Sequence, residues 1–138
     1  MDLPDILHSR ILVLDGAMGT MIQRYKLSES DFHSAPFSSV RQALEGDNEC
    51  LNLTHPEIIE SIPRSYIDAG ADIIECNTFS ANRISQSVYG CEAFAAKMAY
   101  EGVRIARKVA DEADGEVWVP RTHGLTSKYL SLACDLAN

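Results

Sequence analysis

The sequence predicts an α/β protein whose strands form a parallel sheet. Short apolar runs alternate along the chain with longer segments of helical periodicity, and glycine-containing or polar turns follow the apolar runs. After a short amphipathic helix at residues 3–10, the order is strand, helix, strand, helix, strand. Alternation of this kind produces right-handed βαβ units, in which the strands run parallel to one another.

The first strand is expected at residues 11–14, an unbroken run of Ile, Leu, Val and Leu. Such a run is typical of a strand that is buried on both faces. A helical turn or two is expected at residues 20–25. Residues 26–50 are polar and irregular. They form either a long functional loop or a disordered segment, and the sequence leaves both alternatives open.

The next helix has a marked beginning. Thr54 is expected to cap it, with Glu57 as the reciprocal partner three residues later and Pro56 in the first turn. Apolar residues recur at helical spacing as far as Gly70, which is expected to end the helix. Pro63 lies inside the helix, where it removes a backbone hydrogen bond and is expected to produce a kink.

The remaining elements continue the alternation. Residues 71–75 are expected to form the second strand, residues 91–113 a long helix and residues 117–119 the third strand. Three parallel strands leave sheet edges open, and a complete (β/α)8 TIM barrel takes about 250 residues. We therefore interpret residues 1–138 as one partial domain of about three βα units, cut from a larger α/β fold.

Composition excludes several classes of protein. The formal net charge of −8 and the pI of about 4.8 argue against a nucleic-acid partner, which usually binds a basic face. No apolar run is long enough to span a bilayer, and the first ten residues do not form a secretory signal. A cytoplasmic location without a membrane partner is therefore expected.

The four cysteines do not form a zinc motif. None of them is spaced as a CxxC pair, and a disulfide framework is not expected in a cytosolic chain of this size. Each is expected to be a buried small hydrophobe or a free thiol, so we assign no metal ligand to Cys50, Cys76, Cys91 or Cys134.

The first candidate binding residues follow the first strand. Ligands in parallel α/β folds bind at the carboxyl ends of the strands, where Asp15 and Gly16 lie. The Asp15 carboxylate can accept hydrogen bonds from a ligand ammonium, and glycines let a ligand carboxylate approach backbone N–H groups. These features suit a zwitterionic amino acid. A turn aspartate that caps the next helix is an equally weighted alternative.

A second polar cluster follows the second strand. Glu75 and Asn77 are two positions apart and therefore point to the same side, where they either bind polar ligand groups or hold neighbouring loops. Cys76 points the other way and is expected to be a packing residue. His123, near the end of the third strand, has no second ligand or carboxylate at metal spacing, so a functional role for it is not expected.

Several of these segments resemble the homocysteine S-methyltransferase family. LDGAMGT at residues 14–20 looks like the family signature, and LNLTHPE at residues 51–57 resembles its loop and helix start. AGADIIECNTF at residues 69–79 is similar to its second strand, and residues 126–132 resemble the segment after the third. The resemblance covers residues 10–138, and its wording favours the methionine synthase branch over the betaine-dependent branch.

The resemblance implies the N-terminal part of a (β/α)8 barrel that holds homocysteine at its carboxyl face. In that branch the thiolate lies on zinc and takes a methyl group from methylcobalamin on another module, the methyl coming from 5-methyltetrahydrofolate on a folate module. The product is methionine. The family pattern assigns Asp15 and Gly16, with Ala17 adjacent, to the amino acid, and Glu75 and Asn77 to the pocket wall.

The chain also departs from the family pattern. The zinc cysteines of the family lie beyond the position of residue 138, so no metal ligand and no catalytic residue is assigned, and the isolated chain is expected to be inactive. The third strand end reads AGSIGPT in the family, whereas Arg121 and His123 place bulk and charge there. Pro63 is a further departure.

Three functions remain open. The first is part of a homocysteine S-methyltransferase that uses cobalamin or a different methyl donor, with its remaining strands missing or on another chain. The second is an inactive fragment that self-associates through its open sheet edges. The third is an unrelated barrel enzyme that uses Asp15 and Glu75 as acid and base. The motifs favour descent from a homocysteine S-methyltransferase. The missing strands favour the inactive, self-associating fragment as the behaviour of the chain alone.

Overall fold

The computed structural model describes residues 3–120, Gly124 and Thr126. Its helical elements, in chain order, are α1 (Leu3–Ser9), α2 (Met18–Gln23), α3 (Glu29–Phe32), η1 (Asn48–Cys50), α4 (Leu51–Thr54), α5 (Pro56–Asp68), α6 (Arg83–Gln86), η2 (Ser87–Tyr89), η3 (Glu92–Phe94) and α7 (Ala95–Asp111). Within these residues, no helix has both the length and the apolar character needed to cross a bilayer.

Three extended segments pair in parallel. Leu14 bridges to Ile73, and Ile73 bridges in turn to Trp118, so the segments lie side by side in chain order. The Asp15 N–H donates to the Ile73 carbonyl at 2.8 Å, and the Trp118 N–H donates to the Asp72 carbonyl at 2.9 Å. The predicted parallel order is confirmed. Strands of regular length do not form in the described part of the chain, because each pairing is an isolated bridge.

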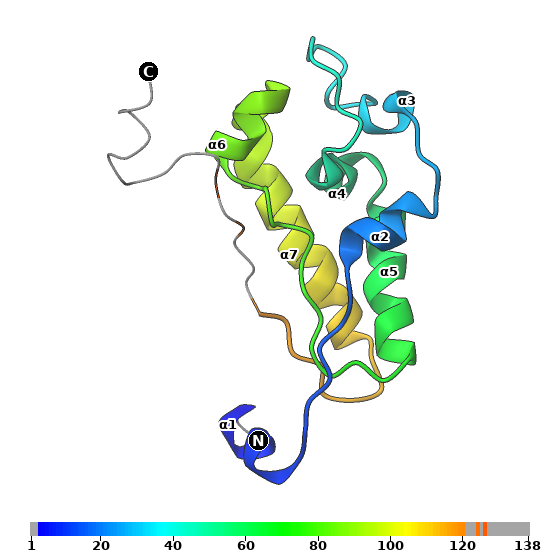
Figure 1. Cartoon of the computed structure of the whole chain (residues 1–138), viewed down its shortest axis with the longest axis vertical. Helices are drawn as coiled ribbons and strands as arrows, with labels where there is room; N and C mark the ends of the chain where they lie inside the picture. The colour runs from blue at the N-terminus through cyan, green and yellow to red at the C-terminus, as the bar shows by residue number, and fades with distance from the viewer. Residues whose placement is uncertain (1–2, 121–123, 125, 127–138) are drawn as a thin grey trace, which may run out of the picture.

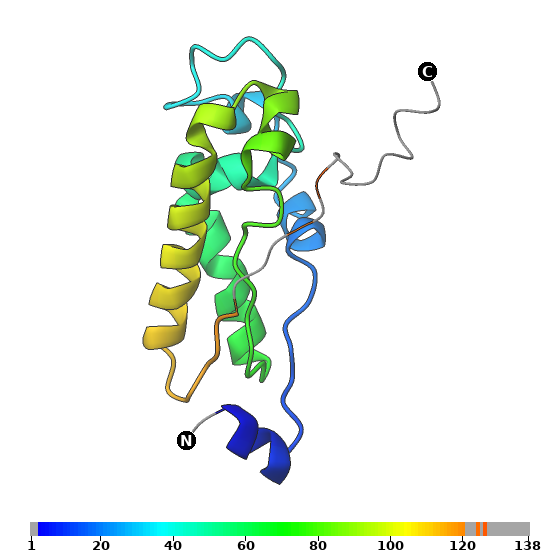
Figure 2. The same ribbon diagram turned by 90° about the vertical axis from the view of Figure 1, so that its left-hand side faces the viewer.

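Helices and extended segments form two layers. The long helices α5 and α7 pack against each other and lie along one side of the three extended segments, whereas α1 stands apart at one end (Figures 1 and 2). A larger core joins the helices to the loop of residues 26–50, and a smaller one lies between α7 and the extended segments. The smaller core contains Ile74, Cys76, Ala106, Val109, Ala110 and Val117.

The first extended segment is not buried on both faces, as its apolar run predicted. Ile11 is 88% exposed, and Val13 and Leu14 are each 53% exposed. The physical reason is its edge position, since the segment bridges to Ile73 alone among the described residues. An apolar run predicts a strand that can be buried on both faces. Burial itself requires other strands and helices to pack against it.

The expected cap of α5 is wrong. Thr54 is the last residue of α4, and its buried Oγ1 has no hydrogen-bond partner among the described residues. His55 is the N-cap, and Glu57 bonds to His55 Nδ1 at 2.9 Å instead of completing a capping box with Thr54. The helix begins later than expected because residues 51–54 already form a helical turn of their own.

The ends of the two long helices are closer to expectation. Gly70 follows the C-cap of α5 with φ of +102°, a conformation that glycine adopts without strain, so its predicted role is confirmed. The helix runs continuously through Pro63, whose side chain is buried. The second long helix, α7, begins at Ala95 rather than near Cys91, because η3 occupies the preceding turn.

The long segment of residues 26–50 is folded against the core, so the disordered alternative is wrong. Phe37 and Leu44 are fully buried, and the Phe37 ring meets Phe94 edge to face with 4.8 Å between centroids. The Glu29 carboxylate accepts hydrogen bonds from the backbone N–H groups of Leu44 at 2.8 Å and Glu45 at 2.6 Å. This loop delivers the side chains of η1 to the candidate site.

Candidate functional site

A cavity of about 320 Å³ lies where the first two extended segments end. Asp15 and Gly16 follow the bridging residue Leu14, and Glu75 and Asn77 follow Ile73. The cavity is lined by Asp15, Gly16, Met18, Gly19, Gly46, Asn48, Glu49, Glu75, Cys76, Asn77, Phe79 and Ser80. Four of the five residues predicted from the sequence therefore line one cavity at the carboxyl ends of these segments.

Asp15 joins the two segments and keeps one oxygen free. The backbone N–H of Glu75 donates to Asp15 Oδ2 at 3.0 Å. The other oxygen, Oδ1, is buried without a hydrogen-bond partner among the described residues. Burial raises the pKa of the Asp15 carboxyl above its ordinary value, and the nearby Glu75 carboxylate adds to the effect. A cationic donor at Oδ1 would give this oxygen a hydrogen-bond partner and would stabilise the charged form of the buried carboxylate.

The amide of Asn77 is already engaged. Its Nδ2 donates to the Asn48 carbonyl at 2.8 Å and to Asn52 Oδ1 at 2.9 Å. Asn52 Nδ2 returns a bond to the Asn77 carbonyl at 2.8 Å and donates a second to the Met98 carbonyl at 3.0 Å. Asn77 thus holds η1 and α4 against the cavity wall, which is the loop-holding alternative left open by the sequence. Glu75, by contrast, is exposed.

Gly16 and Ala17 have different surroundings. A Cβ at Gly16 would lie 2.8 Å from Tyr66 Oη, so a side chain at this position would displace the Tyr66 ring. The Ala17 carbonyl accepts a hydrogen bond from the same Tyr66 hydroxyl at 3.3 Å. Ala17 is not among the residues that line the cavity. Its place in the structure is at the junction between the first extended segment and α5.

Glu49 is a cavity residue that the sequence reasoning missed. It is 5% exposed, and its Oε1 accepts a hydrogen bond from the Ser80 backbone N–H at 2.7 Å. Burial, with a smaller contribution from the nearby Asp47, raises the pKa of the Glu49 carboxyl to about 7. The signal in the sequence was indirect, because long ordered loops are often functional, but no spacing rule placed Glu49 beside Asp15.

The third segment also approaches the cavity. The Gly124 N–H donates to the Phe79 carbonyl at 2.9 Å, and a Cβ at Gly124 would lie 2.4 Å from that oxygen. Glycine is therefore required where this part of the chain passes Phe79. Arg121 and His123, the predicted departures from the family pattern, lie outside the described residues.

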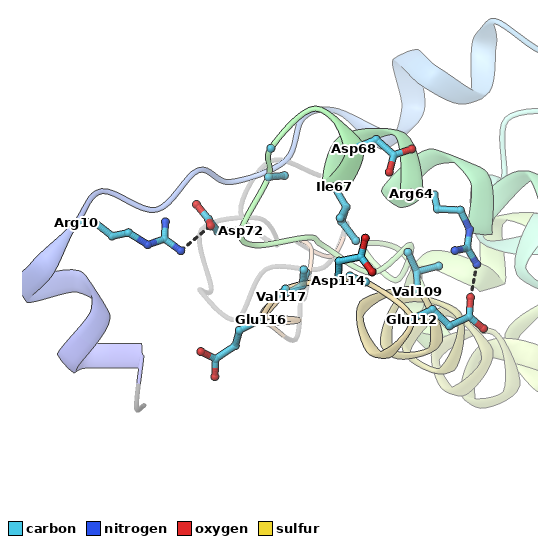
Figure 3. Close-up of a pocket in the computed structure, with 14 residues that line it drawn as sticks. Arg10, Arg64, Ile67, Asp68, Asp72, Val109, Glu112, Asp114, Glu116 and Val117 are labelled. Carbon is cyan, nitrogen blue, oxygen red and sulfur yellow. Dashed lines mark hydrogen bonds and ion pairs between the residues drawn. The ribbon is translucent and has the colours of Figure 1, made fainter.

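A second cavity, of about 430 Å³, opens at the opposite end of the extended segments. Its wall carries two ion pairs, Arg10 with Asp72 at 2.7 Å and Arg64 with Glu112 at 2.5 Å (Figure 3). Asp72 also accepts a hydrogen bond from the Val13 N–H at 2.8 Å, and its pKa lies below its ordinary value because of Arg10. These contacts are satisfied internally, and the amino ends of parallel strands usually serve stability rather than binding.

The described residues contain one group that could hold a metal ion. Asp47, Cys50 and Cys91 are all buried, and their ligand atoms lie within 4.8 Å of one another. Cys50 Sγ donates to Asp47 Oδ2 at 2.9 Å. Burial raises the pKa of both thiols, that of Cys91 to about 11. None of the three lines the cavity that contains Asp15.

The sequence comparison decides the family. A family model described as Homocysteine S-methyltransferase matches residues 12–137, nearly the whole chain. The chain belongs to the homocysteine S-methyltransferase family. The matched residues include every residue that lines the Asp15 cavity.

Two solved structures share the fold of this family member. The first is the metallated form of the homocysteine methyltransferase MmuM from Escherichia coli, with 22% identity and a TM-score of 0.64. That match covers 99% of this chain and 43% of the MmuM chain. The oxidized form of the same protein matches with 23% identity and a TM-score of 0.66, covering 88% and 40%. The chain thus spans less than half the length of these structures.

Proposed function

We propose that this chain supplies the amino-acid half of a homocysteine S-methyltransferase site. The observation that carries the proposal is the buried Oδ1 of Asp15, which has no partner among the described residues and lies in a cavity whose other carboxyl groups are Glu49 and Glu75. Three carboxyl groups and no Lys or Arg among the lining residues favour a cationic ligand group. The ammonium of homocysteine would donate a hydrogen bond to Asp15. Gly16 has no side chain, so the carboxylate of the amino acid could approach the backbone there.

The wider architecture belongs to the same proposal. The parallel order of the extended segments and the likeness to the MmuM structures support the first βα units of a (β/α)8 barrel. Residues 1–138 are then a partial homocysteine-binding domain. Homocysteine is its substrate, and the remaining barrel carries the other half of the site.

Zinc is the metal that the family resemblance implies, and it would supply deprotonation of the substrate thiol. The described residues do not fit that role. A catalytic zinc keeps one coordination position open to substrate, whereas Asp47, Cys50 and Cys91 are buried and line no part of the Asp15 cavity. The part that the residues of the Asp15 cavity would play in catalysis is therefore to bind and orient the amino acid, and we route no step through a metal.

The methyl donor has two candidates. The wording of the sequence motifs supports the cobalamin-dependent methionine synthase branch, with methylcobalamin and folate on separate modules. The second candidate is a homocysteine methyltransferase that uses another donor, the alternative that the sequence motifs leave open. Methionine formed by the protein together with its remaining barrel would be measured with and without methylcobalamin. Formation that requires methylcobalamin supports the first candidate, and formation with another donor alone supports the second.

A binding experiment tests the amino-acid site. We expect L-homocysteine to bind the chain in calorimetry, and 4-mercaptobutanoate, which has the thiol and carboxylate but lacks the ammonium, to bind at least about tenfold more weakly, as for a lost charge-assisted hydrogen bond. Equal affinity for the two compounds would show that the ammonium is not recognised, and the proposed role of Asp15 would be wrong.

Self-association is a second candidate for the chain alone, favoured by the exposed Ile11, Val13 and Leu14 on the open edge. Sedimentation velocity over a range of concentrations would test it, with Ile11→Lys as the variant expected to shift the chain towards monomer. A wild-type chain that stays monomeric throughout contradicts this candidate without touching the amino-acid site.

A further inference from the structure

One buried polar cluster has no part in the proposed amino-acid site. It consists of Asp47 before η1, Cys50 at the end of η1 and Cys91 before η3, and it lies inside the larger core. Asp47 is 1% exposed, and both cysteines are 0% exposed. A carboxylate is costly to bury, and Asp47 accepts one hydrogen bond from Cys50 and one from Gln86, both from neutral groups that leave its charge unpaired.

The donor set suits a thiophilic divalent ion. Two sulfurs and one carboxylate oxygen all lie within 4.8 Å of one another, so small side-chain movements would bring them to the separations of about 3.5–3.8 Å between ligand atoms around tetrahedral zinc. Coordinated thiols are deprotonated, so an ion would replace the hydrogen bond from Cys50 to Asp47 with a bond to each residue. Cysteine and carboxylate are both common zinc ligands, whereas calcium and magnesium prefer oxygen alone.

Gln86 supplies an independent observation beside this cluster. Its Nε2 donates to Asp47 Oδ1 at 2.9 Å, so the carboxamide contacts the cluster directly. The Gln86 side chain is 0% exposed, and its buried Oε1 has no hydrogen-bond partner among the described residues. Nε2 is the atom that faces Asp47, and it also donates to the Ser80 carbonyl at 3.2 Å, so the carboxamide would have to turn over to present Oε1 to an ion. Oε1 would then be a fourth ligand, as structural zinc almost always requires.

We propose that Asp47, Cys50 and Cys91 form a closed structural site for zinc, with Gln86 Oε1 or a water molecule as the fourth ligand. The site is separate from the catalytic zinc that the family implies, because its ligands line no part of the Asp15 cavity. It joins the loop of residues 26–50 to the turn before α7. The ion would therefore fix η1, which carries the cavity residues Asn48 and Glu49.

Because the ligands are buried, the ion must enter as the chain folds. The chain would be unfolded with a chelator and refolded with cobalt, which reports thiolate ligands through sulfur-to-cobalt charge transfer. The main protein is the Cys76→Ser/Cys134→Ser variant, in which Cys50 and Cys91 are the remaining cysteines. We expect one cobalt per chain, a two-thiolate charge-transfer band, displacement of cobalt by zinc and a higher thermal midpoint with zinc.

Single ligand substitutions complete the test. In that background Cys50→Ser and Cys91→Ser should each lose about half of the band and at least about tenfold in zinc affinity. A folded two-cysteine variant without a charge-transfer band, or one whose band survives both substitutions, overturns the proposal. If the single variants do not fold, the charge-transfer band of the two-cysteine variant is the test, because Cys50 and Cys91 are its only thiols.

Discussion

The Glu75 backbone N–H donates to Asp15 Oδ2 at 3.0 Å, which joins the ends of the first two extended segments at the candidate site. This bond leaves Asp15 Oδ1 for a ligand, at the cost of a buried oxygen that has no partner among the residues the structure describes. Binding and stability are therefore expected to oppose each other at this residue.

Asp15→Asn separates the two effects. The pKa of the Asp15 carboxyl is raised in the folded chain, chiefly by burial, so its charged form is less favourable there than in the unfolded chain at neutral pH. An asparagine can still accept the Glu75 bond without that charge. We expect unfolding by denaturant at neutral pH to show equal or greater stability for Asp15→Asn. A clear loss of stability would mean that Oδ1 has a favourable partner.

A side chain at Gly102 on α7 is expected to destabilise the chain. A Cβ there would lie 2.7 Å from Thr78 Cγ2 and 2.8 Å from Asn52 Nδ2. Gly102→Ala should lower the free energy of unfolding by about 1–2 kcal/mol, the cost of overpacking less the helix propensity gained. Gly115→Ala is the matched control, because a Cβ there meets nothing within 4 Å, and it should change stability by less than about 0.5 kcal/mol. Equal effects in the two variants would contradict the packing described.

The Asn52 amide is expected to be irreplaceable by a carboxylate. Asn52→Asp keeps the shape of the side chain but removes the donors to the Asn77 and Met98 carbonyls, and the residue is 2% exposed. The loss should reach about 2 kcal/mol or more in denaturant unfolding. Asn82→Asp provides the comparison, since Asn82 caps α6 by accepting from the Ser85 N–H and aspartate caps equally well. Similar losses in both variants would be inconsistent with a special role for Asn52.

The loop of residues 26–50 should give the chain a pH dependence. His33 Nδ1 bonds to Glu29 at 2.9 Å and Nε2 bonds to the Val40 carbonyl at 2.8 Å, so the doubly protonated ring satisfies both partners. The pKa of His33 is raised in the folded chain, mainly by the Glu29 bond. Its contribution is therefore complete below the unfolded pKa of about 6.5 and is lost as pH rises through the folded pKa.

Denaturant unfolding between about pH 5 and about pH 8 measures this contribution. We expect the wild-type chain to lose stability towards the upper end of that range, and His33→Gln to show a flatter profile there. A wild-type profile that matches that of His33→Gln would exclude His33 as the group responsible.

The sequence predicted the parallel order and the grouping of four candidate residues around one cavity, because both depend on local patterns. Asp15, Gly16, Glu75 and Asn77 could be placed together since each directly follows an apolar run, and parallel strands end on one side. The exposure of Ile11 could not be predicted from its own run, because burial depends on what lies beside the edge.

Glu49 and the Asp47–Cys50–Cys91 cluster could not be predicted for a different reason. Cys91 lies far along the chain from Asp47 and Cys50, and no spacing rule joins them. Their proximity comes from the fold of residues 26–50, whose anchors, such as the Glu29 carboxylate on two backbone N–H groups, are long-range contacts without a sequence signature.

The central claim is that Asp15 binds the ammonium of homocysteine, and calorimetric titration of L-homocysteine tests it most directly. The wild-type chain is compared with Asp15→Asn and with Asp72→Asn, which removes a carboxylate from the opposite end of the extended segments. We expect the wild type and Asp72→Asn to bind alike, and folded Asp15→Asn to bind at least about tenfold more weakly. Undiminished binding by folded Asp15→Asn, or none by the wild type, would contradict the claim.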